Sequence, residues 1–333
     1  KVYKKPEEVA RRSFAVQVKP KPEGIDAAIE ALSKAKRPII YAGGGVINSG
    51  PQAAMALRQF AKMTGMPVTQ TLMGLGAFPA SDEQFVGMLG MHGTYEANLA
   101  MYNCDVMLNI GARFDDRITG KLDEFSPNST KIHCDIDPSS INKAIMVDIP
   151  VVGDAGEILN ELISGWKNGG HTLDQTAMGK WWDQINAWRS RDCLAFTQKP
   201  GAFEIRPQHA LTQLNKALKG KDFYVSTEVG QHQMWAAQYI DFEDPNRWLT
   251  SGGLGTMGYG LPAIMGAQIA HPESTCVVVA GEASVQMNIQ ELSTIIQYRL
   301  PVKVFIVNNQ WMGMVRQWQE LLHGERYSES YTD

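Results

Sequence analysis

The sequence has few cysteines, no long apolar run and no large excess of charge of either sign. Four cysteines occur in 333 residues, and their spacing matches neither a disulfide framework nor a metal-binding motif. We interpret them as buried free thiols, which are typical of a reducing compartment. No uncharged apolar run approaches the roughly 18 residues that a membrane-spanning helix needs. The net charge of −4 gives no general attraction to nucleic acid or anionic membranes, so neither is expected as a partner.

The start of the chain lacks the apolar segment of a secretory signal peptide, which together with the cysteine usage favours a cytoplasmic protein. The chain also has no initiator Met, and it stops at Asp333 without completing a recognisable element. We therefore expect it to be part of a longer protein.

The remaining composition, 44% apolar and 20% charged, is typical of globular domains, and the length predicts two of them. Strand-like and helical patterns alternate in two series, which favours βαβ units on parallel sheets. We predict an α/β fold with two doubly wound parallel-sheet domains, residues 21–165 and 207–333. Residues 1–20 are interpreted as a linker or arm, and the Trp-rich residues 166–206 as an inter-domain crossover whose Trp side chains serve packing.

The individual elements follow from the same patterns. The predicted strands span residues 38–42, 67–69, 105–110, 131–136, 223–226, 275–280 and 302–307. The predicted helices span residues 25–32, 53–61, 155–162, 207–218, 231–239, 256–270, 288–298 and 312–322.

Several predicted strands of the first domain end in Gly or charged residues. The segment 43–50 is not a good dinucleotide fingerprint, and a plain tight turn explains it as well as a phosphate site. The segment 111–117 contains two Arg and two Asp, which suit either an anion clamp or a surface ion-pair network. Asp135 and Asp137 suit either ribose hydroxyls or the cap of the next helix.

The second domain has a sharper pattern at two strand ends. Glu282 and Asn309 lie 27 residues apart, which is close to one strand–helix–strand unit. If the two strands are neighbours, a carboxylate and an amide oxygen meet at one sheet edge, and these are the ligands that Mg²⁺ prefers. The alternative is a residue at a helix start and an Asn in a turn.

Longer motifs point to one family. Residues 43–50, 89–93, 111–117, 229–235, 251–262 and 308–318 resemble the catalytic large subunit of acetohydroxyacid synthase, also called acetolactate synthase. The resemblance runs from about residue 24 to the last residue. It implies an FAD-binding middle domain followed by a truncated thiamine-diphosphate-binding domain.

The resemblance assigns the thiamine diphosphate and metal sites. The thiamine site would comprise Val229, Gly230, Gln231, His232, Met257, Gly281, Ala283, Ser284, Asn309 and Met314. Mg²⁺ would bind Glu282, Asn309 and the main-chain carbonyl of Trp311. Without the family, a core methionine in a Gly-rich helix is the preferred interpretation of Met257.

The metal motif departs from the family pattern of Gly-Asp-Gly, because this chain has Gly281-Glu282-Ala283. Glu keeps the carboxylate and adds one methylene, whereas Ala lacks the freedom of glycine at positive φ. We expect a retained site with Glu282 as ligand. A mispositioned or metal-free site is the alternative.

The resemblance also assigns a flavin site and two substrate residues. FAD would contact Gly43, Gly44, Thr71, Leu72, Gly74, Leu89, Gly90, Met91, His92, Gly93, Gly111, Arg113, Asp115, Asp135, Ile136, Asp154 and Ala155, and its role would be mainly structural. Arg117 would meet a substrate carboxylate, and Trp318 would shape the pocket for the second keto acid.

The implied activity is that of a transferase. It decarboxylates pyruvate and joins the product to a second 2-keto acid, pyruvate or 2-ketobutyrate, giving 2-acetolactate or 2-aceto-2-hydroxybutyrate for branched-chain amino acid synthesis. The family's ylid-forming Glu belongs to a preceding domain, so no Glu here has that role and we expect little activity from this chain alone. The resemblance further implies a homo-oligomer, at least a dimer, and a possible regulatory small subunit. A pyruvate oxidase or keto-acid decarboxylase, or a non-catalytic FAD- or nucleotide-binding module, are the alternatives.

Overall fold

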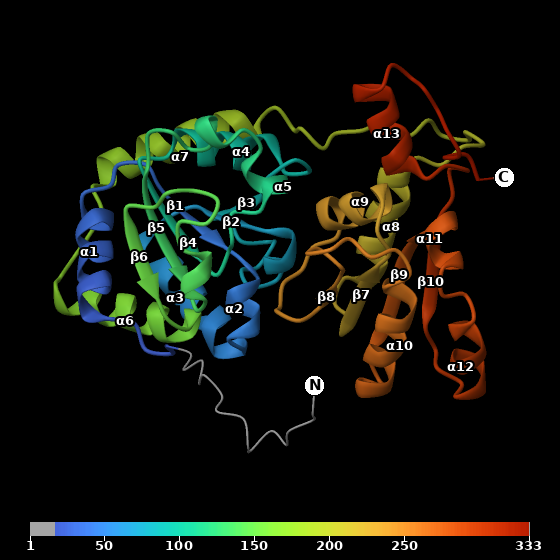
Figure 1. Ribbon diagram of the computed structural model, residues 1–333, viewed down its shortest axis with the longest axis horizontal. Coiled ribbons are helices and arrows are strands. Elements are labelled where there is room, and N and C mark those ends of the chain that lie inside the picture. The colour runs from blue at the N-terminus through green and yellow to red at the C-terminus, as the bar shows by residue number, and fades with distance from the viewer. Residues whose placement is uncertain (1–16, 333) are drawn as a thin grey trace, which may run out of the picture.

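The computed structural model describes residues 17–332, which form two α/β domains that lie side by side (Figure 1). The predicted two-domain, parallel-sheet fold is confirmed. Most of the predicted linker, residues 1–16, lies outside the described residues.

The first domain is built on a six-stranded parallel sheet with the order β3-β2-β1-β4-β5-β6. Its strands are β1 (Pro38–Ala42), β2 (Val68–Gln70), β3 (Phe85–Met88), β4 (Val106–Ile110), β5 (Thr130–Asp135) and β6 (Ile149–Val152). Strands β1 and β4 are buried along their whole length, as central strands of parallel sheets are. The chain runs outward from β1 to β3 and then crosses to β4, which creates a topological switch point between β1 and β4, where such sheets bind ligands.

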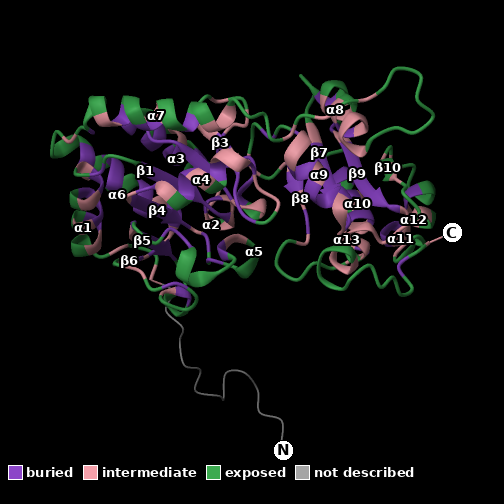
Figure 2. Cartoon of the chain, turned by 90° about the horizontal axis from the view of Figure 1, so that it is seen from above, coloured by how far each residue is buried: buried purple, intermediate pink, exposed green. Residues whose placement is uncertain are grey.

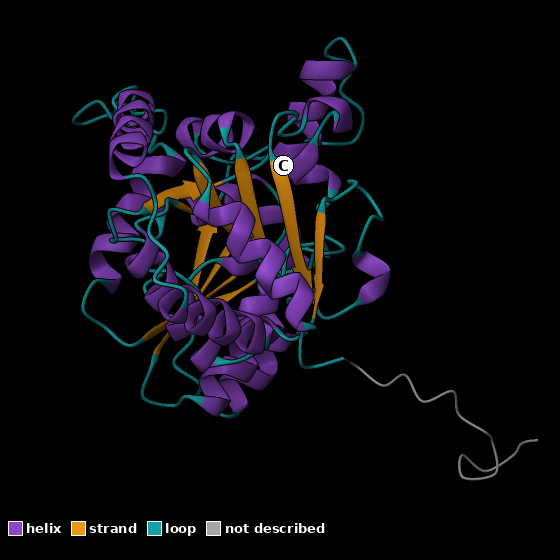
Figure 3. Cartoon of the chain, turned by 90° about the vertical axis from the view of Figure 1, so that its left-hand side faces the viewer, coloured by secondary structure: helices purple, strands orange, loops and turns teal. Residues whose placement is uncertain are grey.

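Helices cover both faces of this sheet (Figures 1 and 3). Helices α1, α3 and α6 pack together on one face, and α4 packs with α7 on the other. Their bounds are α1 (Pro22–Ser33), α3 (Pro51–Thr64), α4 (Tyr95–Asn103), α6 (Ala155–Asn168) and α7 (Gln175–Arg189). Short helical turns follow several strands: α2 (Gly44–Asn48), η2 (Leu72–Gly74), α5 (Asp116–Thr119), η3 (Leu122–Glu124) and η4 (Pro138–Ser140).

The second domain has a four-stranded parallel sheet with the order β10-β9-β7-β8. The strands are β7 (Phe223–Thr227), β8 (Trp248–Leu249), β9 (Thr275–Gly281) and β10 (Lys303–Val307). Strands β7 and β9 are buried, whereas β10 at the edge is more exposed (Figure 2). The switch point of this sheet lies between β7 and β9.

The helices of the second domain also form two layers. Core clusters place α8 (Pro207–Leu218) and α9 (Gln231–Tyr239) on one face, and α10 (Gly260–Ala270) and α12 (Glu291–Gln297) on the other. Two further helices, α11 (Glu282–Gln286) and α13 (Gly313–Leu322), begin directly at or shortly after strand ends.

Two parts of the prediction differ from the structure. The Gly-rich helix predicted from Thr256 begins at Gly260, because the preceding residues form a loop. The segment 166–206 is more than a crossover, since α7 packs in the core of the first domain and the indole N–H of its buried Trp181 donates to the carbonyl of Pro38 at 3.1 Å. The packing role expected of Trp166 and Trp181 is confirmed.

Smaller findings complete the comparison. Strands β3, β6 and β8, each of four residues or fewer, were too short to be predicted, and helix α4 was also not predicted. The four cysteines are free thiols; Cys104, Cys134 and Cys276 are buried as expected, whereas Cys193 is exposed. In the part of the chain that the structure describes, we find no helix with the length and apolarity needed to cross a membrane.

Candidate functional site

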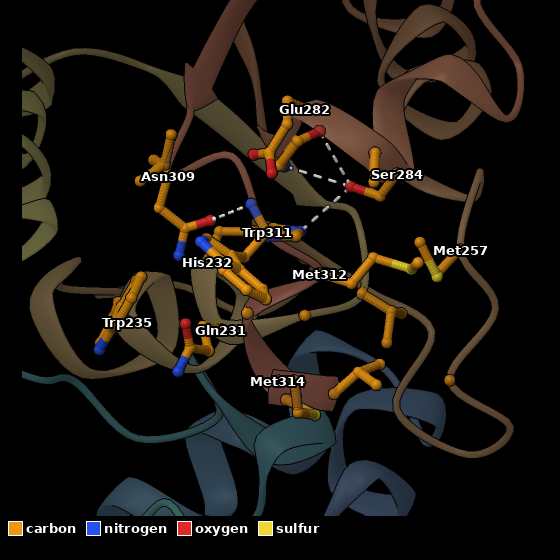
Figure 4. A pocket seen from close by; sticks show the side chains of 18 of the residues that line it. Gln231, His232, Trp235, Met257, Glu282, Ser284, Asn309, Trp311, Met312 and Met314 are labelled. Atoms are coloured by element: carbon orange, nitrogen blue, oxygen red, sulfur yellow. Dashed lines mark hydrogen bonds between the residues drawn. The ribbon is translucent and has the colours of Figure 1, made fainter. Parts of the chain in front are cut away.

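A cavity of about 260 Å³ opens at the carboxyl ends of β7, β9 and β10, around the switch point of the second sheet (Figure 4). The structure brings together there every residue predicted for the thiamine and metal sites, with Trp318 beside them. The lining residues are Val229, Gly230, Gln231, His232, Trp235, Gly255, Met257, Gly281, Glu282, Ala283, Ser284, Val307, Asn309, Trp311, Met312, Gly313, Met314, Val315 and Trp318.

Helix N-termini face this cavity. Gly230 is the N-cap of α9 and Met312 is the N-cap of α13, and both line the cavity with the residues that follow them. No side chain within residues 17–332 caps either helix. Their free N–H groups and the positive ends of the helix dipoles therefore suit an anion such as a diphosphate.

Glycines bring the strand ends close to His232. A Cβ atom at Gly230 or Gly281 would lie 2.6 Å or 2.9 Å from the Cε1 atom of its ring. The ring is therefore packed between the ends of β7 and β9, with Nε2 at 3.5 Å from the hydroxyl of Ser284. Burial lowers the pKa of His232 to about 4, so its imidazole is neutral near pH 7.

Glu282 and Asn309 extend into the cavity from the ends of β9 and β10 (Figure 4). These two strands are parallel neighbours, as the sequence prediction requires, and Gly281 pairs with Val307. Oε1 of Glu282 accepts from the Thr332 hydroxyl at 2.9 Å, and Oδ1 of Asn309 accepts from the N–H of Trp311 at 3.1 Å. Each side chain keeps further lone pairs for a cation.

The altered motif fits its turn without strain. Gly281 is an N-cap with φ of −93°, and Ala283 lies inside α11, where a helical backbone suits alanine. The Ser284 hydroxyl accepts from the N–H of Gly281 at 3.2 Å and closes the turn. Within residues 17–332, no three His, Cys, Asp or Glu side chains gather as a metal cluster. A cation here would therefore rely on one carboxylate and neutral oxygens.

One predicted substrate residue lies elsewhere. Arg117 belongs to α5 of the first domain, is largely exposed and pairs with Asp116 at 2.9 Å, and the cavity-lining residues do not include it. Its role with a substrate stays a prediction. Arg113 pairs with Asp115 at 2.8 Å in the same exposed segment. Both contacts favour the surface ion-pair interpretation of residues 111–117.

Sequence reasoning missed several residues of the site. Trp235, Met312 and Val315 line the cavity, and only the strand-end position of their motifs could have indicated it. Glu228 and Asn288 do not line the cavity but bind the backbone of the loop that carries Met257. Their partner lies 30 residues away in each case, so no local pattern reveals these contacts.

The predicted flavin residues gather at the carboxyl ends of the first sheet. They follow β1 to β6 in turn: Gly43 and Gly44, Thr71 to Gly74, Leu89 to Gly93, Gly111 to Asp115, Asp135 and Ile136, and Asp154 and Ala155. At the switch point, a Cβ at Gly43 would lie 2.3 Å from the carbonyl oxygen of Gly111, so glycine allows the two turns to touch.

Some of these residues already have structural partners. The Asp154 carboxylate caps α6 by accepting from the N–H of Gly156 at 2.9 Å. Asp135 accepts from the N–H of Asp137, which itself caps η4 and thereby favours the capping interpretation. In contrast, the hydroxyl of Thr71 is buried without a partner among the described residues, as expected of a group that awaits a ligand.

Comparisons with known proteins agree with this geometry. Residues 25–162 match the family model "Thiamine pyrophosphate enzyme, central domain", and residues 228–333 match "Thiamine pyrophosphate enzyme, C-terminal TPP binding domain". Thiamine pyrophosphate is another name for thiamine diphosphate.

Curated relatives cover nearly the whole chain. The acetolactate synthase large subunit of Haemophilus influenzae is 47% identical over 99% of this chain and 56% of its own length. Acetolactate synthase isozyme 3 large subunit of Escherichia coli is 47% identical over 98% of this chain and 56% of its own length. The acetolactate synthase large subunit of Parasynechococcus marenigrum is 48% identical over 92% of this chain and 48% of its own length. The chain thus spans about half the length of these relatives, and it belongs to the acetolactate synthase large-subunit family of thiamine pyrophosphate enzymes.

Proposed function

We propose that the cavity of the second domain binds the thiamine diphosphate and Mg²⁺ of an acetolactate synthase. One observation carries the proposal: all the residues assigned to this cofactor and its metal from the sequence line a single cavity at the switch point of the sheet. The uncapped N-termini of α9 and α13 would bind the diphosphate. Glu282, Asn309 and the carbonyl of Trp311 would bind Mg²⁺, which prefers such oxygen ligands.

The protein's own residues supply position and environment. Thiamine diphosphate, when bound, supplies the electron sink for decarboxylation of a 2-keto acid. Met257 and Met314 line the cavity and would orient the cofactor rings, and Trp318 would shape the space for the second keto acid. His232 stays neutral through its burial and would act by packing or as a hydrogen-bonding group.

For the whole protein, the proposed reaction decarboxylates pyruvate and adds the product to pyruvate or 2-ketobutyrate. The products would be 2-acetolactate and 2-aceto-2-hydroxybutyrate. Arg117, which belongs to the first domain, would bind a substrate carboxylate. We further propose a cytoplasmic homo-oligomer, at least a dimer, with a possible regulatory small subunit. Similarity to acetolactate synthase large subunits supports these proposals.

The carboxyl ends of the first sheet would bind FAD in a structural role. Three features support the fit: the glycine contact between Gly43 and Gly111, the unpartnered buried hydroxyl of Thr71, and the strand-end position of the other assigned residues. Adding FAD to the chain should quench flavin fluorescence, and Thr71→Val should weaken that binding. Unchanged binding by the variant would contradict the role of Thr71.

The metal site is tested by titrating thiamine diphosphate into the chain by calorimetry, with Mg²⁺ or with EDTA. We expect binding that depends on Mg²⁺. Glu282→Gln should weaken it by about tenfold or more, because a carboxylate is worth more to a divalent cation than a neutral amide. Glu282→Asp should retain metal-dependent binding.

Glu273→Gln is the matched control, because Glu273 lies on an exposed turn before β9 and is not among the cavity-lining residues. It should bind like the unmodified chain. Equal affinity for thiamine diphosphate with and without Mg²⁺, or no effect of Glu282→Gln on that affinity, would contradict the proposed metal site.

A further inference from the structure

Glu228 is fully buried, although it directly precedes Val229 of the cavity wall. It follows β7, and its burial raises the pKa of its carboxyl group, an effect that backbone N–H groups of residues 258–261 oppose. Burying a carboxylate costs several kcal/mol unless it accepts good hydrogen bonds. Its partners therefore explain why this position tolerates an acid.

Those partners lie at the start of α10. Oε2 of Glu228 accepts from the N–H of Gly258 at 2.5 Å, and Oε1 accepts from the N–H of Leu261 at 3.0 Å. The N-cap residue of α10, Tyr259, makes no capping bond with its own side chain. Glu228 thus supplies from another strand end the acceptor that the first turn of this helix needs.

Gly258 is bound on its other side by Asn288. The amide of Asn288 donates to the carbonyl of Gly258 at 2.5 Å. Gly258 has φ of 88°, and a Cβ there would lie 2.9 Å from both Met287 and Asn288. Both backbone polar groups of one glycine are therefore fixed by side chains, one from the end of β7 and one from beyond α11.

Met257 is the residue next to this glycine, and it lines the cavity (Figure 4). The loop before it is exposed, and Leu254 in that loop is 91% exposed. On the other side of Met257, the N–H of Thr256 donates to the Ser251 hydroxyl at 3.0 Å. We propose that Glu228 and Asn288 are positioning residues, which clamp Gly258 and thereby hold Met257 against the thiamine cofactor.

This inference rests on the proposed function, and a double-mutant cycle on the full chain tests it. Thiamine diphosphate affinity is measured with Mg²⁺ for Glu228→Gln, Asn288→Ala, Met257→Ala and the combinations with Met257→Ala. Gln can accept at only one oxygen and turns its NH₂ group against the other N–H donor. We expect Glu228→Gln and Asn288→Ala each to weaken binding about tenfold.

The decisive measurement is the thiamine diphosphate affinity of the double variants that carry Met257→Ala. There neither Glu228→Gln nor Asn288→Ala should weaken binding further, because the residue through which they act is absent. Asp222→Asn is the control, since Asp222 pairs with Arg247 at 2.7 Å at the opposite end of β7. It should lower stability and leave cofactor affinity unchanged. A role in folding alone would make the effects equal in both backgrounds, and would overturn the inference.

The outcomes separate the two proposals. If the unmodified chain does not bind thiamine diphosphate, the proposed function fails and this inference fails with it. If it binds, but Glu228→Gln and Asn288→Ala bind equally well, only the positioning role fails. Should Glu228→Gln not fold, Asn288→Ala decides, because Asn288 is uncharged and only partly buried.

Discussion

Among individual residues, several side chains near the cavity contact or hydrogen-bond the backbone of the chain itself. His232 is packed between two glycines, Glu228 binds the first turn of α10, and Ser284 closes the turn before α11. These groups fix the strand ends, and so leave the N–H groups of α9 and α13 free for an anion. Contacts within the chain thus shape the walls of the cavity.

His232 should make stability depend on pH. Its pKa is lowered by burial from 6.5 to about 4, so the unfolded chain binds more protons between these values. The free energy of unfolding should therefore fall as pH drops from 6.5 toward 4, by at most roughly 3 kcal/mol from this residue. Urea unfolding at several pH values, with EDTA present, measures it.

The control is His232→Gln, which cannot titrate. Burial also lowers the pKa values of His92 and His133, so some acid sensitivity should remain in the variant. Only the difference between the two proteins reports His232. Parallel pH profiles would mean that its ring is accessible to solvent.

That Glu282 and Asn309 follow neighbouring strands was predictable from the sequence, because parallel strands end at one sheet edge and 27 residues span about one strand–helix–strand unit. The position of Arg117 was not, because no spacing rule relates a residue in one domain to a cavity in another. The clamp on Gly258 was equally hidden, since a buried acid and a loop glycine share no periodicity.

Among helices and strands, strong periodicity gave the right elements and weak local signals did not. Strand β1 and helix α9 have the predicted bounds. The first turn predicted for α10 was wrong, because Gly255 and Gly258 adopt positive φ, which a helix excludes. Helix α7 belongs to the first domain because Trp181 hydrogen-bonds to Pro38 of the sheet and Trp182 to Gly65. These tertiary contacts cannot be read from composition.

Two glycines should respond oppositely to alanine. Gly43→Ala would bring a Cβ to 2.3 Å from the backbone of Gly111, and should cost at least about 2 kcal/mol, because neither turn can move freely. Gly179→Ala lies within α7 with open space around it, and should stabilise by about 0.5–1 kcal/mol. Urea midpoints compare both variants with the unmodified chain, and a tolerated Gly43→Ala would contradict the close contact of the two turns.

For the whole molecule, the two domains are joined by apolar packing of Leu75 and Met88 against the core of the second domain, and by polar contacts near α9. That helix starts at the thiamine cavity, and near its other end Gln238 donates to the carbonyl of His92 at 2.8 Å, within the predicted flavin loop. Beside it, the loop that follows α9 contacts the first domain: Glu243 accepts from the Ser81 hydroxyl at 2.7 Å, and Gly76 packs on Asp244. One helix therefore links both proposed cofactor sites.

Arg58 is the residue through which this link should be tested. Its Nη2 donates to the carbonyls of Glu243 at 2.6 Å and Gly76 at 3.2 Å, so one guanidinium on α3 binds both domains. Arg58→Met keeps the apolar stem and loses these bonds, and should destabilise the chain by about 1–3 kcal/mol.

The same substitution should speed amide exchange in residues 241–247, because Arg58 is one of the groups that fasten that loop to the first domain. Lys62→Met, one turn further along α3, removes a pair with Asp82 that lies within the first domain. Because the Lys62 side chain is itself largely exposed, the loss should cost about 1 kcal/mol and leave exchange in the loop unchanged. Hydrogen exchange by mass spectrometry distinguishes the two variants. Equal exchange in both would mean that the other contacts, such as that of Glu243 with Ser81, hold the loop without Arg58.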